Sequence, residues 1–312
     1  MAYGSGKYTY ELVEGWAKLP EGESFVDVVG ISIDSEDRVY IFNRSKRPLM
    51  VFDKDGNFLT SWGEGIFKRP HGSYLTADGY IYCCDDQSHV VYKFTRDGKL
   101  LMTLGNKDQP SDTGHRPGLD IFERIASIKK GGPPFNLPTG VALSSTGDIF
   151  VSDGYGNARV HKFSADGKLL LSWGEPGGRP GQFRLPHNIW IDQKDRVWIS
   201  DRENSRVQIF SFRGEFIDQW NDLIRPTQVC MDAEGAVYVS ELCRRISIFT
   251  MEGRLLARWG NEGHPPDAPL LVGPHVIAVD SRGDLYVGEV AMTFGKVDRG
   301  ARTVQKFARV KK

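Results

Sequence analysis

The chain has 312 residues, of which 40% are hydrophobic, so it can bury a substantial core and is expected to be globular. Forty lysines and arginines balance forty aspartates and glutamates, so no global charge favours nucleic acid, an anionic membrane or an acidic partner. No stretch approaches the roughly 18 consecutive apolar residues of a membrane span, and the opening MAYGSGKYTYELVEGW lacks the apolar core of a secretory signal.

The four cysteines are too few for a disulfide scaffold and lack the paired spacing of a zinc knuckle. We therefore expect reduced thiols at Cys83, Cys84, Cys230 and Cys243. Together with the missing export signal, they predict a cytoplasmic protein. The balanced charge and the lack of an apolar span predict that it binds neither nucleic acid nor a membrane. The sequence leaves its oligomeric state open.

One pattern recurs six times along the chain. Its units begin near residues 29, 70, 138, 186, 226 and 274. Each unit has short alternating runs rich in Val, Ile, Phe and Tyr, separated by Asp/Gly turns, as in PTGVALSSTGDIFVSDGYGNARVHKF from Pro138. Four short strands at a period of about 40 residues are typical of a propeller blade. The sequence therefore predicts an all-β, six-bladed β-propeller that spans residues 1–312 as a single domain.

The ends of the chain and two insertions depart from this period. The sixth unit lacks its outermost strand, and the N-terminal YELVEGWAKL supplies one, so we expect this strand to complete the last blade and close the ring. Residues 106–135 and 291–301 interrupt the pattern. Because long insertions in a compact domain are usually functional or disordered, we expect both to border a ligand site.

Three histidines share one position of the repeat, the x of the PxG pattern that opens a unit. The first strand of a blade lines the central channel, so this position should place six side chains around one axis. They are Val29, His71, Thr139, His187, Thr227 and His275. Histidine fills every second blade, although only 7 of the 312 residues are histidines.

Alternate blades of six lie about 120° apart, which suits three imidazoles that converge on one ion. The pattern favours a zinc site at His71, His187 and His275 with a position open to water or substrate, and other divalent transition metals are chemically compatible. A solvated polar ring is the alternative interpretation.

A metal enzyme also needs a group that transfers protons, and the ends of the second strands lie around the same channel mouth. Acids recur there in five units and are expected to bind turn backbone: Asp85, Asp153, Asp201, Glu241 and Glu289. Arg44 and Tyr155 depart from the repeat. A guanidinium and a divalent ion would both favour the phenolate of Tyr155, so these two residues are candidates for proton transfer, and ordinary loop chemistry is the alternative.

The repeated units resemble the NHL repeat over nearly the whole chain. Within residues 137–210, the motifs SDGYGN, RPGQF, LPHN and DRENSR together resemble the catalytic core of peptidyl-α-hydroxyglycine α-amidating lyase, also called peptidylamidoglycolate lyase. That family cleaves the C–N bond of an α-hydroxyglycine carbinolamide to give an amide and glyoxylate. The resemblance implies a metal-dependent lyase on an NHL propeller.

The same resemblance assigns roles to residues of this chain. It implies that His71, His187 and His275 hold zinc, that Tyr155 takes the proton of the substrate hydroxyl, and that Arg44 stabilises negative charge on Tyr155 or the substrate. These are the residues that the repeat pattern singles out independently.

Three positions depart from the family pattern. Gly156 stands where the family has a cysteine, and Gly273 and Val276 replace a methionine and an acid beside the last PH motif, which weighs against a structural calcium ion. A cytoplasmic enzyme would not meet secreted peptides, so we expect another small carbinolamide-like substrate. Two alternatives stay open: a metal-dependent hydrolase such as a lactonase, and a non-catalytic NHL interaction scaffold.

Overall fold

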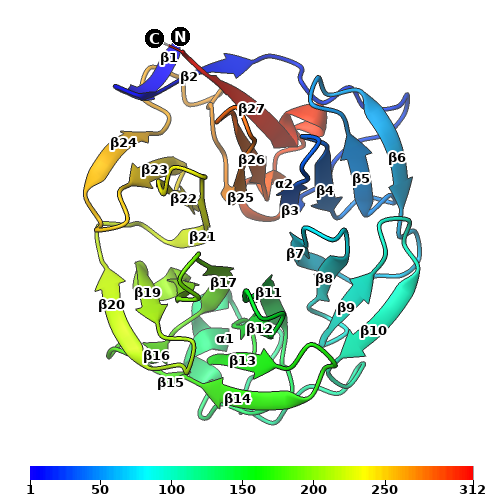
Figure 1. The fold of residues 1–312 in the computed structure, drawn as a ribbon, viewed down its shortest axis with the longest axis vertical. Coiled ribbons are helices and arrows are strands. Elements are labelled where there is room, and N and C mark those ends of the chain that lie inside the picture. Colours follow the sequence, from blue (N-terminus) through cyan, green and yellow to red (C-terminus); the bar gives the residue numbers. More distant parts are fainter. Residues whose placement is uncertain (312) are drawn as a thin grey trace. The chain divides into compact units, whose positions relative to one another are not determined.

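The computed structural model describes residues 1–311, and nearly all of its regular structure is antiparallel β-sheet (Figure 1). Its main sheets are six blades of four or five strands, which confirms the predicted six-bladed β-propeller. The residues cluster into two compact units, a middle unit of residues 66–226 and a terminal unit that joins residues 1–65 to the chain from Thr227 onward. No helix among residues 1–311 is long and apolar enough to cross a membrane.

The middle unit contains blades two, three and four. Blade two consists of β7 (Pro70–Leu75), β8 (Ile81–Asp85), β9 (Val90–Phe94) and β10 (Leu100–Leu104). Blade three consists of β11 (Pro138–Leu143), β12 (Ile149–Asp153), β13 (Arg159–Phe163) and β14 (Leu169–Trp173). Blade four consists of β17 (Pro186–Ile191), β18 (Val197–Asp201), β19 (Arg206–Phe210) and β20 (Phe216–Trp220). Shorter elements of this unit are α1 (Ile121–Ser127), β15 (Glu175–Pro176), β16 (Gln182–Phe183) and the 3-10 turn η1 (Arg202–Asn204).

The terminal unit contains blades one, five and six. Blade one consists of β3 (Val28–Ile33), β4 (Val39–Asn43), β5 (Leu49–Phe52) and β6 (Phe58–Trp62). Blade five consists of β21 (Pro226–Met231), β22 (Val237–Glu241), β23 (Arg245–Phe249) and β24 (Leu255–Trp259), the unit boundary falling after the first residue of β21. Blade six consists of β25 (Pro274–Val279), β26 (Leu285–Glu289), β27 (Val304–Arg309), β2 (Tyr8–Val13) and β1 (Ala2–Ser5). Between β26 and β27 lie α2 (Ala291–Gly295) and η2 (Gly300–Thr303).

The N-terminal strand β2 completes blade six. It pairs antiparallel with β27, from Tyr10 opposite Arg309 to Val13 opposite Lys306, and so covers an edge that β27 would otherwise expose. The hairpin β1–β2 adds a fifth strand that the repeat pattern did not predict. Closure of the whole ring by this pairing stays a prediction.

The core lies between neighbouring blades. The second strand of each blade is buried at all five positions, as is usual for an inner strand of a propeller blade. One apolar cluster in the middle unit joins Phe150 and Trp173 of blade three to Ile189 and Phe210 of blade four. A tryptophan ends the fourth strand of four blades; Trp173, Trp220 and Trp259 are buried, while Trp62 is half-buried.

A β-bulge marks the repeat position that holds the three histidines. In blade four, Pro186 pairs with Asp201 and Asn188 pairs with Ser200, so the register of β17 and β18 shifts at His187. The same irregularity occurs at the corresponding position of blades one, two, three and six. Because a bulge turns a side chain out of the regular alternation, this backbone feature gives the position its common direction.

The glycine that follows this position allows neighbouring first strands to approach closely. A Cβ atom on Gly72 would lie 2.5 Å from the carbonyl oxygen of Thr139, and one on Gly140 would lie 3.1 Å from Cα of Asn188. Glycine at these two positions is therefore required by the close packing of neighbouring blades.

The two insertions are ordered and are held to the blades by buried polar groups. In the first, the buried hydroxyl of Thr113 donates a hydrogen bond to the carbonyl oxygen of Gly156, in the loop that follows β12. In the second, the buried carboxylate of Asp27 accepts hydrogen bonds from the N–H groups of Met292 and Thr293 in α2.

Thr139 occupies the histidine position in blade three and bridges two blades. Its buried hydroxyl lies 2.7 Å from the carbonyl oxygen of Pro186 in blade four and 3.0 Å from that of Ser152.

We expect Thr139→Val to lower the free energy of unfolding by about 1–3 kcal/mol, because the shape is retained and buried carbonyl oxygens lose a donor. Denaturant unfolding measures the change. The control Thr103→Val, on exposed β10, should change stability by about 0.5 kcal/mol or less. Equal effects of the two substitutions would contradict the bridging role.

Candidate metal centre

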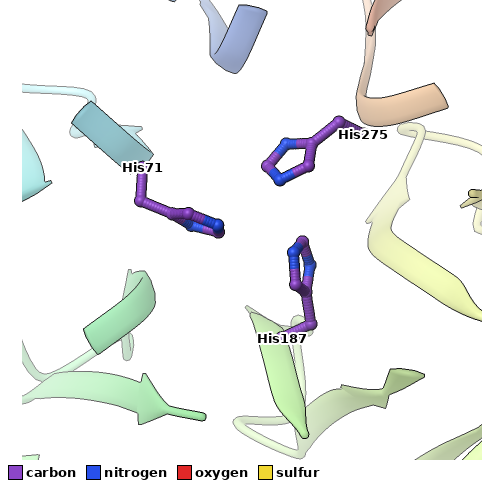
Figure 2. Close-up of side chains that lie close together, drawn as sticks. All are labelled: His71, His187 and His275. Carbon is purple, nitrogen blue, oxygen red and sulfur yellow. The ribbon is translucent and has the colours of Figure 1, made fainter. Parts of the chain in front are cut away.

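The structure places the three predicted histidines at the second residue of β7, β17 and β25, and all three are buried. Figure 2 shows their imidazoles, and the ligand atoms of His71, His187 and His275 lie within 4.8 Å of one another, so these residues could hold a metal ion. Three neutral imidazoles are a donor set that suits zinc and other divalent transition metals.

His71 is held in the tautomer that a metal ligand needs. Its Nδ1 atom lies 2.6 Å from the carbonyl oxygen of Thr139 in the neighbouring blade. Because a carbonyl oxygen only accepts, Nδ1 carries the proton and Nε2 of the neutral ring keeps its lone pair. Such a backbone contact on the second ring nitrogen is the usual way in which a protein orients a ligating histidine. The ring of His71 also meets the ring of His187 edge to face, with centroids 5.0 Å apart.

Tyr155 lies against these two histidines in the middle unit. It follows the end of β12, and its hydroxyl oxygen lies 3.3 Å from Nε2 of His187. Its ring packs edge to face on His71, with centroids 5.2 Å apart. The guanidinium carbon atoms of Arg69 and Arg202 lie 5.5 and 5.4 Å from the centre of this ring. The predicted proton-transfer residue therefore contacts two of the three histidines and two cations.

Arg202 donates a hydrogen bond from Nη1 to the Tyr155 hydroxyl over 3.0 Å. It is buried, and its Nε donates to Glu203, which also accepts from Arg225. Burial alone would lower the pKa of Arg202, but the negative charges of a Tyr155 phenolate and of Glu203 raise it above its usual value. Arg202 is therefore a fixed cation beside the tyrosine oxygen.

Sequence reasoning did not single out Arg202, although a signal was present. Arg202 directly follows the second strand of blade four, and Arg44 directly follows the second strand of blade one, so both occupy one position of the repeat. Arg44 itself lies in the terminal unit, where its Nη1 atom is 3.2 Å from both Asp27 and Thr293. The pairing of Arg44 with Tyr155 stays a prediction.

Four of the five recurrent acids bind backbone N–H groups, as expected: Asp85, Asp153, Asp201 and Glu289. Glu241 instead accepts hydrogen bonds from the side chains of Arg245 and Ser247. Asp85 accepts hydrogen bonds from the N–H groups of Lys68 and Arg69, which lead into Pro70 and His71. Asp201 and Glu289 bind the segments that lead into His187 and His275 in the same way. Burial raises the pKa of Asp201 and of Glu289, although hydrogen bonds and nearby arginines oppose the shift. Asp85, Asp201 and Glu289 thus each fix the approach to one histidine.

Gly156, which departs from the family pattern, has a steric reason to be glycine. Its N–H donates to the carbonyl oxygen of Asn136, and its own carbonyl accepts from the buried hydroxyl of Thr113 over 2.6 Å. A Cβ atom at this position would lie 2.1 Å from Oδ1 of Asn136. The first insertion therefore packs directly against the residue that follows Tyr155.

Comparisons with known proteins agree with this architecture. The sequence model of the NHL repeat matches residues 135–163 and 183–210. The solved "Streptogramin B lyase structure" superposes with a TM-score of 0.61 over 99% of this chain and 90% of that chain, at 16% sequence identity, which shows the fold alone. Fold and repeat together define an NHL-type β-propeller.

The sequence relatives place the chain within this class. It is 30% identical over 342 aligned residues to NHL repeat-containing protein 3 of Homo sapiens, covering 96% of this chain and 84% of that protein. The chain belongs to the family of NHL repeat-containing proteins. It is also 32% identical over 180 residues to peptidyl-alpha-hydroxyglycine alpha-amidating lyase 1 of Drosophila melanogaster, covering 54% of this chain and 30% of that protein.

The ion-pair cluster around Glu203 makes stability depend on pH. Burial alone would raise the pKa of Glu203, but Arg202 and Arg225 lower it below its ordinary value near 4.5. A lowered carboxyl pKa adds stability above the unfolded pKa, and this stability is lost as the pH falls through the folded pKa.

We therefore expect wild-type protein to lose more unfolding free energy than Glu203→Gln between pH 7 and about pH 3. Denaturant unfolding across this range tests the difference, with exposed Glu64→Gln as the control. Parallel curves for wild type and Glu203→Gln would refute it.

Proposed function

We propose that the protein is a zinc-dependent lyase that cleaves the C–N bond of an α-hydroxylated, carbinolamide-like small substrate. The observation that carries this proposal is the position of the Tyr155 hydroxyl, between Nε2 of His187 and the buried guanidinium of Arg202. The similarity to an amidating lyase over about half of the chain supports the reaction class.

His71, His187 and His275 are the residues that would hold the metal. The Nδ1 contact of His71 with Thr139 fits this role, because it leaves Nε2 as the lone-pair nitrogen. Three protein ligands are typical of catalytic zinc sites, which keep one position open. When bound, zinc supplies a Lewis acid that makes a nearby hydroxyl group more acidic. Other divalent transition metals are compatible with the same ligands.

Tyr155 is proposed to move the proton. Its phenolate accepts the proton of the substrate hydroxyl, the C–O bond becomes a carbonyl, and the electron pair of the C–N bond passes to nitrogen. Tyr155 then returns the proton to that nitrogen, so an amide and a carbonyl product leave without the consumption of water. A positioned proton donor and acceptor of this kind contributes about 10²–10⁴-fold to a rate.

Arg202 is proposed to stabilise the phenolate in this cycle. It is already hydrogen-bonded to the Tyr155 oxygen and is held on its other side by Glu203, so little reorganisation is needed when negative charge appears. Arg44 is proposed to bind negative charge on the substrate, as the family resemblance implies. Its guanidinium is fixed by the buried carboxylate of Asp27.

Product analysis separates this proposal from a hydrolase such as a lactonase. With an N-acyl-α-hydroxyglycine as substrate, a lyase releases the acyl amide and glyoxylate and incorporates no oxygen from labelled water into the amide. A hydrolase incorporates water oxygen into an acid product.

We propose a reducing compartment, the cytoplasm, for this activity. All four cysteines are free thiols; Cys83, Cys84 and Cys230 are buried and Cys243 is exposed. Unpaired thiols of this kind are usual where glutathione and thioredoxin keep cysteine reduced.

Single replacement of each proposed ligand should remove the metal. We expect purified wild-type protein to contain about one zinc ion per chain, and His71→Ala, His187→Ala and His275→Ala to lose most of it, because a tri-histidine site has no spare ligand. Elemental analysis measures the content. His264→Ala, at a histidine that contacts Tyr3, is the control and should retain zinc. Wild-type protein without stoichiometric metal would favour the interaction scaffold.

Removal of the Tyr155 hydroxyl should abolish turnover and spare the metal. We expect Tyr155→Phe to lower kcat by about 10²–10⁴-fold on an N-acyl-α-hydroxyglycine, since the proton acceptor is lost. Glyoxylate release measures the rate, and elemental analysis should find the zinc content unchanged. Tyr80→Phe, on a ring packed under Lys93, is the matched control. Full turnover by Tyr155→Phe would refute the proton-transfer role.

A further inference from the structure

A cleft of about 740 Å³ in the middle unit carries an inference that rests on the proposed function. It lies between the first insertion and the loops of blades two and three. We propose that this cleft receives the acyl part of the lyase substrate and that this acyl part carries a carboxylate. The substrate class would then be N-acyl-α-hydroxyglycines with an anionic acyl group.

The cleft opens at the end of the blades where His71 lies. Two of its lining residues, Lys68 and Arg69, directly precede Pro70 and His71. Asn136 and Leu137 line it from the segment that enters β11, and His89 lines it from the turn after β8. Its size is within the roughly 300–1,000 Å³ of ordinary small-molecule sites.

Two contacts join the cleft to Tyr155. Arg69, which lines the cleft, also lies over the ring of Tyr155. Thr113, which also lines the cleft, donates a hydrogen bond from its hydroxyl to the carbonyl oxygen of Gly156, the residue after Tyr155. In the proposed reaction Tyr155 returns a proton to the substrate nitrogen, so the acyl group bonded to that nitrogen lies beside Tyr155. The cleft adjoins Tyr155 in the middle unit and can therefore receive this acyl group.

Hydrogen bonds within the protein hold the wall that the insertion supplies. Ser111 donates its N–H to Phe135 and accepts a hydrogen bond from the Asn136 amide on its carbonyl oxygen. The carbonyl oxygen of Thr113 accepts a hydrogen bond from the N–H of Lys129. A preformed wall costs little ordering entropy when a ligand enters.

The charges of the cleft favour an anion. Its lining includes three cations, Lys68, Arg69 and Arg124, and one carboxylate, Asp112. Lys68 is paired with Asp108, Arg69 with Asp86, and Asp112 with Lys130. Arg124 forms no ion pair within residues 1–311, and its Nε atom is buried without a hydrogen-bond partner there. The cation left to bind a ligand is therefore Arg124.

Two histidines of the cleft add neutral polar groups. Nδ1 of His89 accepts a hydrogen bond from the backbone N–H of Leu137, so the neutral ring carries its proton on Nε2 as a donor. Burial lowers the pKa of His89, and burial followed by the charge of Arg124 lowers the pKa of His115. Nε2 of His115 is buried without a hydrogen-bond partner in the described chain. A carboxylate that binds Arg124 would meet N–H donors here.

Two substrates of equal length test the proposal. We expect wild-type protein to prefer N-glutaryl-α-hydroxyglycine over N-pentanoyl-α-hydroxyglycine in kcat/KM. Arg124→Gln should lower kcat/KM for the glutaryl substrate by about 10- to 100-fold and leave the pentanoyl substrate nearly unchanged, because a charge-assisted hydrogen bond is lost. Arg124→Lys, which keeps the charge, should recover part of the preference. Lys129→Gln, exposed on the same insertion but outside the cleft, is the matched control.

A binding experiment separates this proposal from the lyase itself. Glutaramate and pentanamide, the two product amides, are titrated calorimetrically into Tyr155→Phe protein with and without Arg124→Gln. Arg124-dependent preference for glutaramate supports the anionic cleft even if no substrate turns over, in which case the proposed lyase fails. The cleft proposal is overturned if Arg124→Gln changes neither the relative kcat/KM of the two substrates nor the relative affinity of Tyr155→Phe protein for the two amides. Turnover of both substrates would then leave the proposed lyase standing.

Discussion

The candidate centre depends on one repeated interaction, the buried carboxylate that ends a second strand and binds backbone N–H groups just before a first strand. In blade two, Asp85 fixes the segment that leads into His71, and in blade four Asp201 fixes the segment that leads into His187. A carboxylate that accepts several backbone bonds holds its loop firmly, since each bond to a charged group is stronger than a neutral one. The bulge at the next residue then directs the histidine out of the ladder.

The sequence predicts this arrangement well where the repeat governs it. The alternation of apolar residues and the Asp/Gly turns recur at a regular period, so the blades, their strands and the position shared by His71, His187 and His275 follow from alignment of the units. The N-terminal strand of blade six is also foreseen, because a missing strand in a repeat has to be supplied elsewhere.

Features outside the repeat could not be foreseen. The contact between Arg202 and Tyr155 joins side chains of two blades, and its direction depends on rotamers that a one-dimensional pattern does not contain. The first insertion has no counterpart among the units, so its cleft has no template either. The fifth strand β1 arises from a hairpin at the end of the chain, which no repeat constrains. The steric role of Gly156 likewise requires the position of Asn136, which is distant from it in sequence.

The bulge has a consequence for how such proteins diversify. Because the bulged residue falls outside the regular register of its two strands, its side chain is not bound by the alternation of the ladder. Threonine there ties two blades together, as Thr139 does, and histidine there offers a ligand nitrogen. Substitutions at this one position can therefore change which side chains meet inside the propeller, while the hydrogen-bond ladder of each blade is kept.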